Sequence, residues 1–181
     1  MGKIAVHEFS SLDGVVENPS WTADYPFDPK MGEAIGAITM SSQGILLGRR
    51  TYEMFEPAWS ARTAAEDPGA PFFNETRKFV VSGMLESADW NNSEILGPYD
   101  AQTIRALKER LDGDLYVSGS VSLVRAMLAD GLVDELHLFV YPVVLGSGLR
   151  LFGEGRAPVK LALGATEQYG SGVLHLTYGP A

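Results

Sequence analysis

The chain has no cysteine among its 181 residues. Disulfide frameworks, thiolate metal sites and a cysteine nucleophile are therefore excluded. The hydrophobic fraction of 45% is nevertheless sufficient for a folded core. Because about 100–200 residues commonly form one domain, we expect a single domain over residues 1–181 that folds without covalent or metal cross-links.

Positive charge is also scarce, since 14 Lys and Arg face 23 Asp and Glu, for a net charge of −9 at pH 7. Nucleic acids and anionic membrane surfaces attract proteins with an excess of Lys and Arg, so neither is an expected partner. The longest strand-like apolar run, residues 138–145, is interrupted by Pro142, far short of the ~20 apolar residues of a membrane span. The N-terminus lacks a cleavable leader pattern, and we predict a cytoplasmic protein.

Short apolar runs alternate with segments of helical periodicity. Strands are predicted at 3–10, 45–47, 78–82, 94–96, 115–117, 133–144, 161–169 and 173–178. Helices are predicted to begin at Pro29 behind the cap Asp28 and to span 100–111 and 121–129. This alternation predicts an α/β fold with a mostly parallel central sheet, helices on both faces and a C-terminal antiparallel hairpin.

A glycine and a proline predict where two helices in the first half of the chain end. Gly44 is expected to end the first helix, and Pro57 to stop a second helix that begins near Tyr52. Residues 58–73 are then expected to be a loop or irregular helix, long enough to be a binding flap.

One turn carries two adjacent arginines at a predicted helix start. Gly48 ends an apolar strand and is followed by Arg49, Arg50 and Thr51. A helix N-terminus repels cations, so arginines there favour a bound anion, and guanidinium groups suit phosphate oxygens. Alternatively, the arginines are solvated and pair with Glu53 or Glu56.

A second turn combines a strand end, Gly119, Ser120 and the first helical residue Val121. Backbone N–H groups at such a turn bind phosphate, although Gly and Ser are also ordinary residues at a helix start. Two such turns in one sheet, one with arginines, suit a dinucleotide with an extra phosphate on its ribose. That combination favours NADPH over NADH.

Other potential chemistry is weaker. His7, His137 and His175 are isolated in strands without metal-ligand spacing, so sheet histidines with ordinary partners are the better interpretation and no metal site is expected. Ser82 and Ser120 lack a Gly-x-Ser-x-Gly elbow, which disfavours a hydrolase.

Several blocks together resemble one known superfamily. They are Leu-Asp-Gly at 12–14, LGRRTYE at 47–53, Val-Val-Ser at 80–82 and SGSVSLVRAMLADGLVDELHLFVYPVVLGSGLRLF at 118–152. Over essentially the whole chain the sequence resembles the dihydrofolate-reductase-like superfamily. It is most similar to the reductase domain of bacterial riboflavin biosynthesis and its stand-alone relatives.

This resemblance implies an NADPH-dependent reductase, usually a homodimer, acting on a small-molecule substrate. The residues it implies for the cofactor are Ser11, Gly48, Arg49, Arg50, Thr51, Ser82, Gly119, Ser120 and Val121. Those it implies for the substrate are Asp13, Gly14, Trp21 and Trp59, with the 146–148 turn nearby. Asp13 is the catalytic candidate, as proton donor or substrate anchor, although a simple turn residue is the alternative; Trp21 and Trp59 could stack on a ring or only pack.

The chain also departs from the superfamily pattern. Dihydrofolate reductases carry a carboxylate on the first helix, where this chain has Gly32 with Glu33 one step around the helix. Relatives often have Gly-Gly where this chain has Gly119-Ser120. Three hypotheses therefore stay open: a reductase that transfers hydride to a C=N or C=O bond of a pterin- or ribosylaminopyrimidine-like heterocycle, a non-catalytic nucleotide-binding protein, and a structural dimerisation domain.

Overall fold

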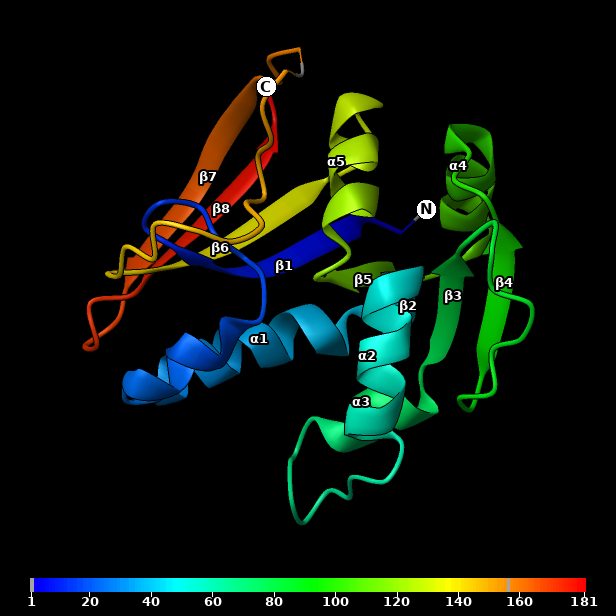
Figure 1. Cartoon of the computed structure of the whole chain (residues 1–181), viewed down its shortest axis with the longest axis horizontal. Helices are drawn as coiled ribbons and strands as arrows, with labels where there is room; N and C mark the ends of the chain where they lie inside the picture. The colour runs from blue at the N-terminus through cyan, green and yellow to red at the C-terminus, as the bar shows by residue number, and fades with distance from the viewer. Residues whose placement is uncertain (1, 156) are drawn as a thin grey trace.

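One eight-stranded sheet runs through the molecule in the order β4-β3-β2-β5-β1-β6-β8-β7 (Figure 1). The computed structural model describes residues 2–155 and 157–181. The strands are β1 (Ile4–Ser11), β2 (Ser42–Gly48), β3 (Arg77–Val81), β4 (Ser93–Gly97), β5 (Asp114–Ser118), β6 (Glu135–Tyr141), β7 (Leu161–Gln168) and β8 (Leu174–Pro180). Strands β1 to β6 pair in parallel, whereas β8 pairs antiparallel with β6 and β7.

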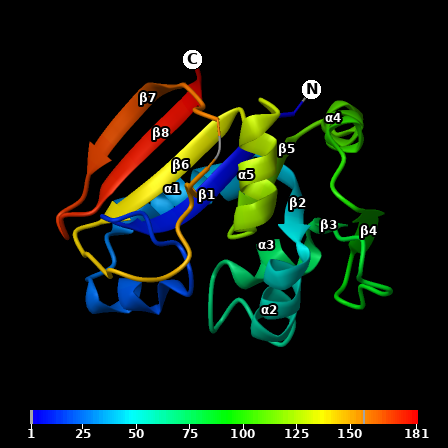
Figure 2. The same cartoon turned by 45° about the horizontal axis from the view of Figure 1, so that its top comes forward.

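Helices cover both faces of the sheet. One face packs against α4 (Ala101–Arg110) and α5 (Val121–Ala129). The other packs against α1 (Pro29–Met40), α2 (Arg49–Trp59) and α3 (Ala70–Glu75), with the short 3-10 helix η1 (Pro19–Asp24) beside α1. Figure 2 shows α5 on the near face and α1 behind β1 and β6. The predicted α/β class and the C-terminal hairpin are confirmed.

The apolar strand centres explain this layering. Ile45, Leu46 and Leu47 are all fully buried, because helices lie on both sides of β2. Alternate residues of β1 point to opposite faces, so that Val6 packs on the α5 side and Ala5 on the α2 side. Each fully buried Val, Leu or Ile side chain contributes about 1.5–3 kcal/mol to the stability of the fold.

The first helix begins as predicted but ends earlier. The Asp28 side chain accepts the Lys30 N–H at 3.0 Å, and Pro29 takes the first helical position. Gly44 does not end this helix, because α1 stops at Met40 and Gly44 lies within β2. A Cβ at Gly44 would lie 2.9 Å from the Leu115 and Phe79 side chains, so close packing accounts for the glycine.

The prediction that Pro57 stops the second helix is wrong. Helix α2 continues through Pro57 to Trp59, and α3 begins at Ala70, within the segment expected to be a loop or irregular helix. The Trp59 ring stacks on Phe73 of α3 with centroids 4.2 Å apart. This tertiary contact holds the last turn of α2 although the proline removes one helical hydrogen bond.

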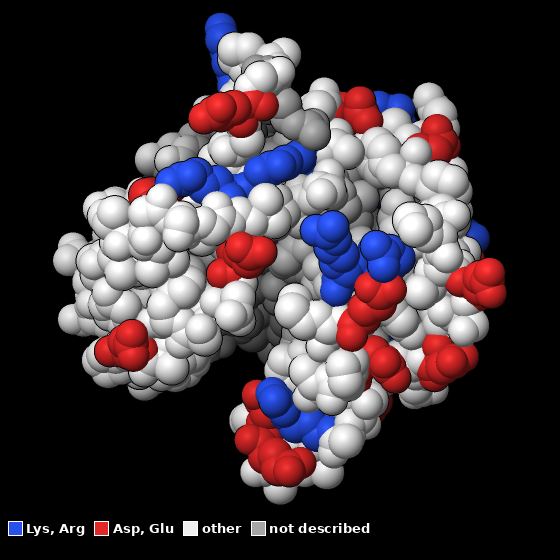
Figure 3. All heavy atoms as spheres, in the orientation of Figure 1, with Lys and Arg blue, Asp and Glu red and all other residues white. Residues whose placement is uncertain are grey.

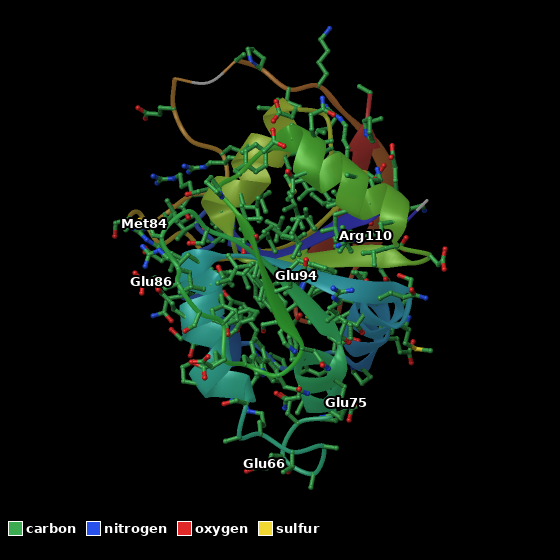
Figure 4. The ribbon with its side chains drawn as sticks, turned by 90° about the vertical axis from the view of Figure 1, so that its right-hand side faces the viewer. Glu66, Glu75, Met84, Glu86, Glu94 and Arg110 are labelled. Atoms are coloured by element: carbon green, nitrogen blue, oxygen red, sulfur yellow. The ribbon has the colours of Figure 1, made fainter. Side chains whose placement is uncertain are left out.

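Charged side chains protect the β4 edge of the sheet. Glu94 of β4 pairs with Arg77 and, at 4.0 Å, with Arg110 of α4. Figure 4 looks onto this edge and shows Glu94 and Arg110 on the same side. Charges on an edge strand oppose pairing with another sheet. Among the helices of the described residues, none is long and apolar enough to cross a membrane.

Candidate functional site

The candidate site lies at the carboxyl ends of β2, β5 and β1, which run parallel and meet at one edge. Helix α2 leaves β2 toward one face of the sheet, and α5 leaves β5 toward the other. Neighbouring strands whose helices leave in opposite directions open a crevice at their carboxyl ends. In Figure 3 the surface is hollowed in this part of the molecule, between α1 and α2, and Lys and Arg side chains border the hollow.

The two turns predicted from the sequence are joined directly. The Gly48 N–H donates to Ser120 Oγ at 3.0 Å, and the Ser120 N–H donates to Thr51 Oγ1 at 2.8 Å. The structure therefore brings together residues 69 and 72 positions apart in the sequence. Each turn fixes the backbone of the other.

The second turn has a left-handed backbone at two consecutive residues, with φ of 61° at Gly119 and 51° at Ser120. A Cβ at Gly119 would lie 3.2 Å from the Thr51 side chain, so glycine allows this close approach. The Ser120 N–H, which the sequence assigned to a phosphate, is already bonded to Thr51. The amides left for a ligand are those of the first turns of α2 and α5, including Val121, which have no intrahelical acceptor.

The two arginines differ in their contacts. Arg49 Nη1 donates to both carboxylate oxygens of Glu53, at 2.9 and 3.0 Å. This is the pairing that the sequence offered as the alternative to a bound anion. Arg50 is exposed and makes no hydrogen bond or ion pair with any residue that the structure describes. Of the two guanidinium groups, Arg50 is therefore the one available to a ligand.

Ser82 follows β3 at the same edge of the sheet. Its hydroxyl accepts the amides of Met84 at 3.1 Å and Leu85 at 2.9 Å, and its own N–H donates to Gly97 O. Ser82 thus shapes the loop after β3, and its hydroxyl lone pairs are engaged within that loop.

Asp13 organises the loops beyond β1. Its carboxylate accepts the Ser11 hydroxyl at 2.7 Å and the amides of Leu145 and Gly146 at 3.1 and 2.9 Å. Arg150 donates to the Asp13 carbonyl at 2.9 Å. The hydrogen bonds to the carboxylate, first that from Ser11 and then those from Leu145 and Gly146, hold the pKa of Asp13 well below its usual range. The carboxylate is therefore ionised at neutral pH, which suits an anchor better than a proton donor.

The two tryptophans lie in different places. Trp21 belongs to η1 and packs edge-on against Tyr141 with centroids 5.3 Å apart; its buried Nε1 has no acceptor among the residues that the structure describes. Trp59 lies at the far end of α2 from Arg49, about 15 Å along the helix at 1.5 Å per residue. The structure does not bring Trp59 to the joined turns. Gly14 has φ of 84° in the turn beside Asp13.

Two ionisable residues of β1 are buried: Glu8, which the sequence interpretation missed, and His7, which it took for a sheet histidine with ordinary partners. His7 Nδ1 lies 2.8 Å from the Tyr116 hydroxyl, while its Nε2 is buried and finds no partner in the described part of the chain. Glu8 is only 3% exposed. Its signal was an acidic residue inside an otherwise strand-like run. The expected lack of a metal centre stays a prediction; no group of three or more His, Cys, Asp or Glu suited to a metal occurs in the described part of the chain.

The chain matches one known protein family over almost its whole length. The model of the RibD C-terminal domain matches residues 2–175. The chain belongs to this family. Its relatives include two proteins of Bacillus subtilis (strain 168). YyaP is 27% identical over 175 residues, covering 93% of this chain and 89% of YyaP, and YwjB is 26% identical over 165 residues, covering 90% of each chain.

Solved structures show the same fold at lower identity. A protein of Shewanella sp. PV-4 superposes with a TM-score of 0.82 at 20% identity, covering 100% of this chain and 99% of its own. The diaminohydroxyphosphoribosylaminopyrimidine deaminase/5-amino-6-(5-phosphoribosylamino)uracil reductase of Thermotoga maritima gives a TM-score of 0.67 at 18% identity, over 99% of this chain and 57% of that one. Riboflavin biosynthesis reductase Rib7 of Saccharomyces cerevisiae gives 0.62 at 16% identity, over 99% and 90%.

As a member of the RibD C-terminal domain family, the chain has the dihydrofolate-reductase-like fold that the resemblance implied. Membership of the family supports a reductase-like role. The single-domain organisation, the site residues, the homodimer and the cytoplasmic location stay predictions.

Proposed function

We propose that the protein is an NADPH-dependent reductase that transfers hydride to a C=N or C=O bond of a small heterocycle, similar to a pterin or a ribosylaminopyrimidine. The observation that carries this proposal is the joining of the Gly48–Thr51 and Gly119–Val121 turns at one edge of the sheet. The Thermotoga maritima and Saccharomyces cerevisiae proteins of the same fold are named as reductases, which supports the reaction class.

The residues at this edge fit a dinucleotide. The first turns of α2 and α5 supply unpaired backbone amides, which favour phosphate groups. Arg50 supplies a guanidinium group without a protein partner, suited to the 2′-phosphate that distinguishes NADPH from NADH. Arg49 would join it after release from Glu53, at small cost because an exposed pair of this kind contributes about 0.3–0.5 kcal/mol.

The residues of the chain would bind and orient the reactants. When bound, the reduced nicotinamide supplies the hydride. Asp13 would hold the loop around Gly146 against the reacting rings, because its carboxylate accepts the Gly146 amide, and the Ser11 hydroxyl would orient that carboxylate by donating to it. Asp13 would serve as a substrate anchor in its ionised form. Trp21 and Gly14 would border the substrate, since both lie beside the loops that follow β1.

The cofactor assignment is tested by titrating Arg50→Ala and Arg49→Ala with NADPH and with NADH, followed by nicotinamide fluorescence. Loss of a charge-assisted contact of about 1.5–3 kcal/mol lowers NADPH affinity about 10- to 150-fold. We expect this loss in Arg50→Ala, with NADH affinity unchanged, and a smaller loss in Arg49→Ala. An unchanged NADPH/NADH ratio in both variants would refute the assignment.

One observation favours the second candidate, a nucleotide-binding protein without turnover. No carboxylate lies at Gly32 on α1, and Glu33 is exposed to solvent. Turnover assays with dihydropterins and with ribosylaminopyrimidines distinguish the two candidates. The predicted homodimer is tested separately by light scattering of the purified chain.

A further inference from the structure

Glu8 is a buried carboxyl group that no described side chain satisfies. It lies in the middle of β1 and is only 3% exposed, and its Oε1 has no hydrogen-bond partner within residues 2–155 and 157–181. A buried polar atom without a partner costs about 1–3 kcal/mol and calls for an explanation. In a binding site, a ligand atom can supply the missing partner.

The position of Glu8 is the point where two strands separate. β1 pairs with β5 up to the couple His7↔Ser118, and from Glu8 onward it pairs only with β6. Because side chains alternate along a strand, Glu8 points to the same face as Val6, where α5 packs. The Gly119 backbone amide interacts with the Glu8 carboxyl. Glu8 therefore lies close to the Gly119–Ser120 turn.

Within residues 2–155 and 157–181, no Lys or Arg contributes to the ionisation of Glu8. On α5, Arg125 donates to the carbonyls of Leu151 and Arg150. On β5, burial raises the pKa of the Tyr116 hydroxyl, so this neighbour is uncharged at neutral pH. On β6, His137 is kept neutral by burial, which lowers its pKa.

Burial therefore dominates the ionisation of Glu8. It raises the pKa of the carboxyl well above its usual range, and the Gly119 amide only partly offsets the effect. A neutral carboxylic acid carries one O–H donor, and the described residues offer that donor no acceptor. The Glu8 O–H is therefore a hydrogen-bond donor that a bound ligand could use.

We propose that Glu8 is an un-ionised ligand-binding residue whose O–H donates to a phosphate oxygen of the dinucleotide held by the free amides of the first turn of α5. The identity of the ligand rests on the proposed function, whereas the neutral state of Glu8 does not. An O–H to phosphate hydrogen bond is charge-assisted and strong. An ionised Glu8 would instead repel the phosphate, so binding requires that the proton stay on Glu8.

The first experiment needs no ligand. Infrared difference spectra between the native chain and Glu8→Gln, recorded from pH 6 to pH 10, isolate the Glu8 carboxyl. We expect the band of a protonated carboxyl at neutral pH, replaced by carboxylate bands only at alkaline pH. A carboxylate signal at pH 7 would overturn the proposal. Should Glu8→Gln fail to fold, the same titration on the native chain with ¹³C-labelled glutamate, followed by NMR, gives the same decision.

The second experiment measures NADPH and NADH affinity of the native chain and Glu8→Gln from pH 7 to pH 10. Native affinity is expected to fall by up to about tenfold per pH unit above the pKa of Glu8. Glu8→Gln keeps an N–H donor and cannot ionise, so its affinity, whatever its value at pH 7, should stay level up to pH 10. Both dinucleotides should respond equally, because both carry the pyrophosphate.

The outcomes separate this inference from the proposed function. Equal pH dependence in the native chain and Glu8→Gln would overturn the role of Glu8 while leaving NADPH binding intact. Failure of the native chain to bind either dinucleotide would overturn the proposed function and the ligand assigned to Glu8, while the infrared result would still decide its ionisation. A response confined to NADPH would contradict a pyrophosphate contact.

Discussion

Thr51 Oγ1 accepts the backbone amide of Ser120 at 2.8 Å, across 69 residues of sequence. Thr51 is 5% exposed and Ser120 is 7% exposed, so water does not replace this bond. The contact fixes a left-handed residue at the start of α5 beside the start of α2. One buried hydrogen bond thereby sets the distance between the two turns.

Thr51→Val should therefore reduce stability. The substitution keeps the shape of the side chain but leaves the Ser120 amide buried without an acceptor, at a cost of about 1–3 kcal/mol. Urea unfolding measures the loss. Thr51→Ser retains the hydroxyl and is the matched control. Equal stability of the Val and Ser variants would show that the hydrogen bond contributes nothing.

Asp13→Asn should loosen the loop at the mouth of the site. Asp13 carries a full negative charge that accepts the amides of Leu145 and Gly146, and an uncharged amide accepts such bonds more weakly. Hydrogen exchange of these two amides should accelerate several-fold, whereas exchange in β2 should not change. Unaltered exchange at Leu145 and Gly146 would contradict the anchoring role.

Lys78 of β3 is fully buried, and its ammonium group lies at the C-terminal end of α3. Its Nζ donates to the carbonyls of Phe73 at 2.6 Å, Asn74 at 3.3 Å and Thr76 at 2.9 Å. Burial lowers the pKa of Lys78 to about 8. Lys78→Met leaves these carbonyls without their donor and should destabilise the fold by roughly 1–3 kcal/mol in urea unfolding.

The matched control is Lys30→Met on α1, where the lysine is exposed. A surface substitution of this kind should change stability by no more than about 0.5 kcal/mol. Similar losses at Lys78 and Lys30 would mean that the carbonyl contacts do not stabilise the protein.

The histidines should make the fold sensitive to acid. Burial, first among the causes, lowers the pKa of His7 to about 3 and of His175 to about 4, and lowers that of His137. In the unfolded chain each histidine binds a proton near pH 6.5. Their stabilisation is therefore complete above pH 6.5 and is lost as pH falls toward 4 and 3, by up to about 1.4 kcal/mol per pH unit for each histidine.

His175→Phe tests this slope. The His175 ring stacks on Phe139 at a centroid distance of 4.2 Å, and a phenylalanine can keep that stacking without titrating. Urea unfolding between pH 6.5 and pH 4 should show a pH slope smaller by about one proton than in the native chain. An unchanged slope would mean that His175 is already neutral or equally protonated in both states.

Local pattern predicted most elements because their signals are local. Helix α5 was expected at 121–129 and spans Val121–Ala129, since its apolar positions repeat at helical spacing. The long strand expected at 133–144 is shorter, Glu135–Tyr141. The end of α2 was predicted wrongly, because proline usually ends a helix and the stacking of Trp59 on Phe73 is a contact between segments that the local sequence does not reveal.

Local sequence patterns were enough to predict the succession of strands and helices along the chain, the two glycine turns and the resemblance to the family. Those features depend on neighbouring residues and on their spacing. The contacts of the folded chain were needed to show that Asp13 is held ionised by the amides of Leu145 and Gly146, and that Glu8 is buried where β1 and β5 part. Burial and hydrogen bonding between distant segments set charge states, and neither is a property of the local sequence.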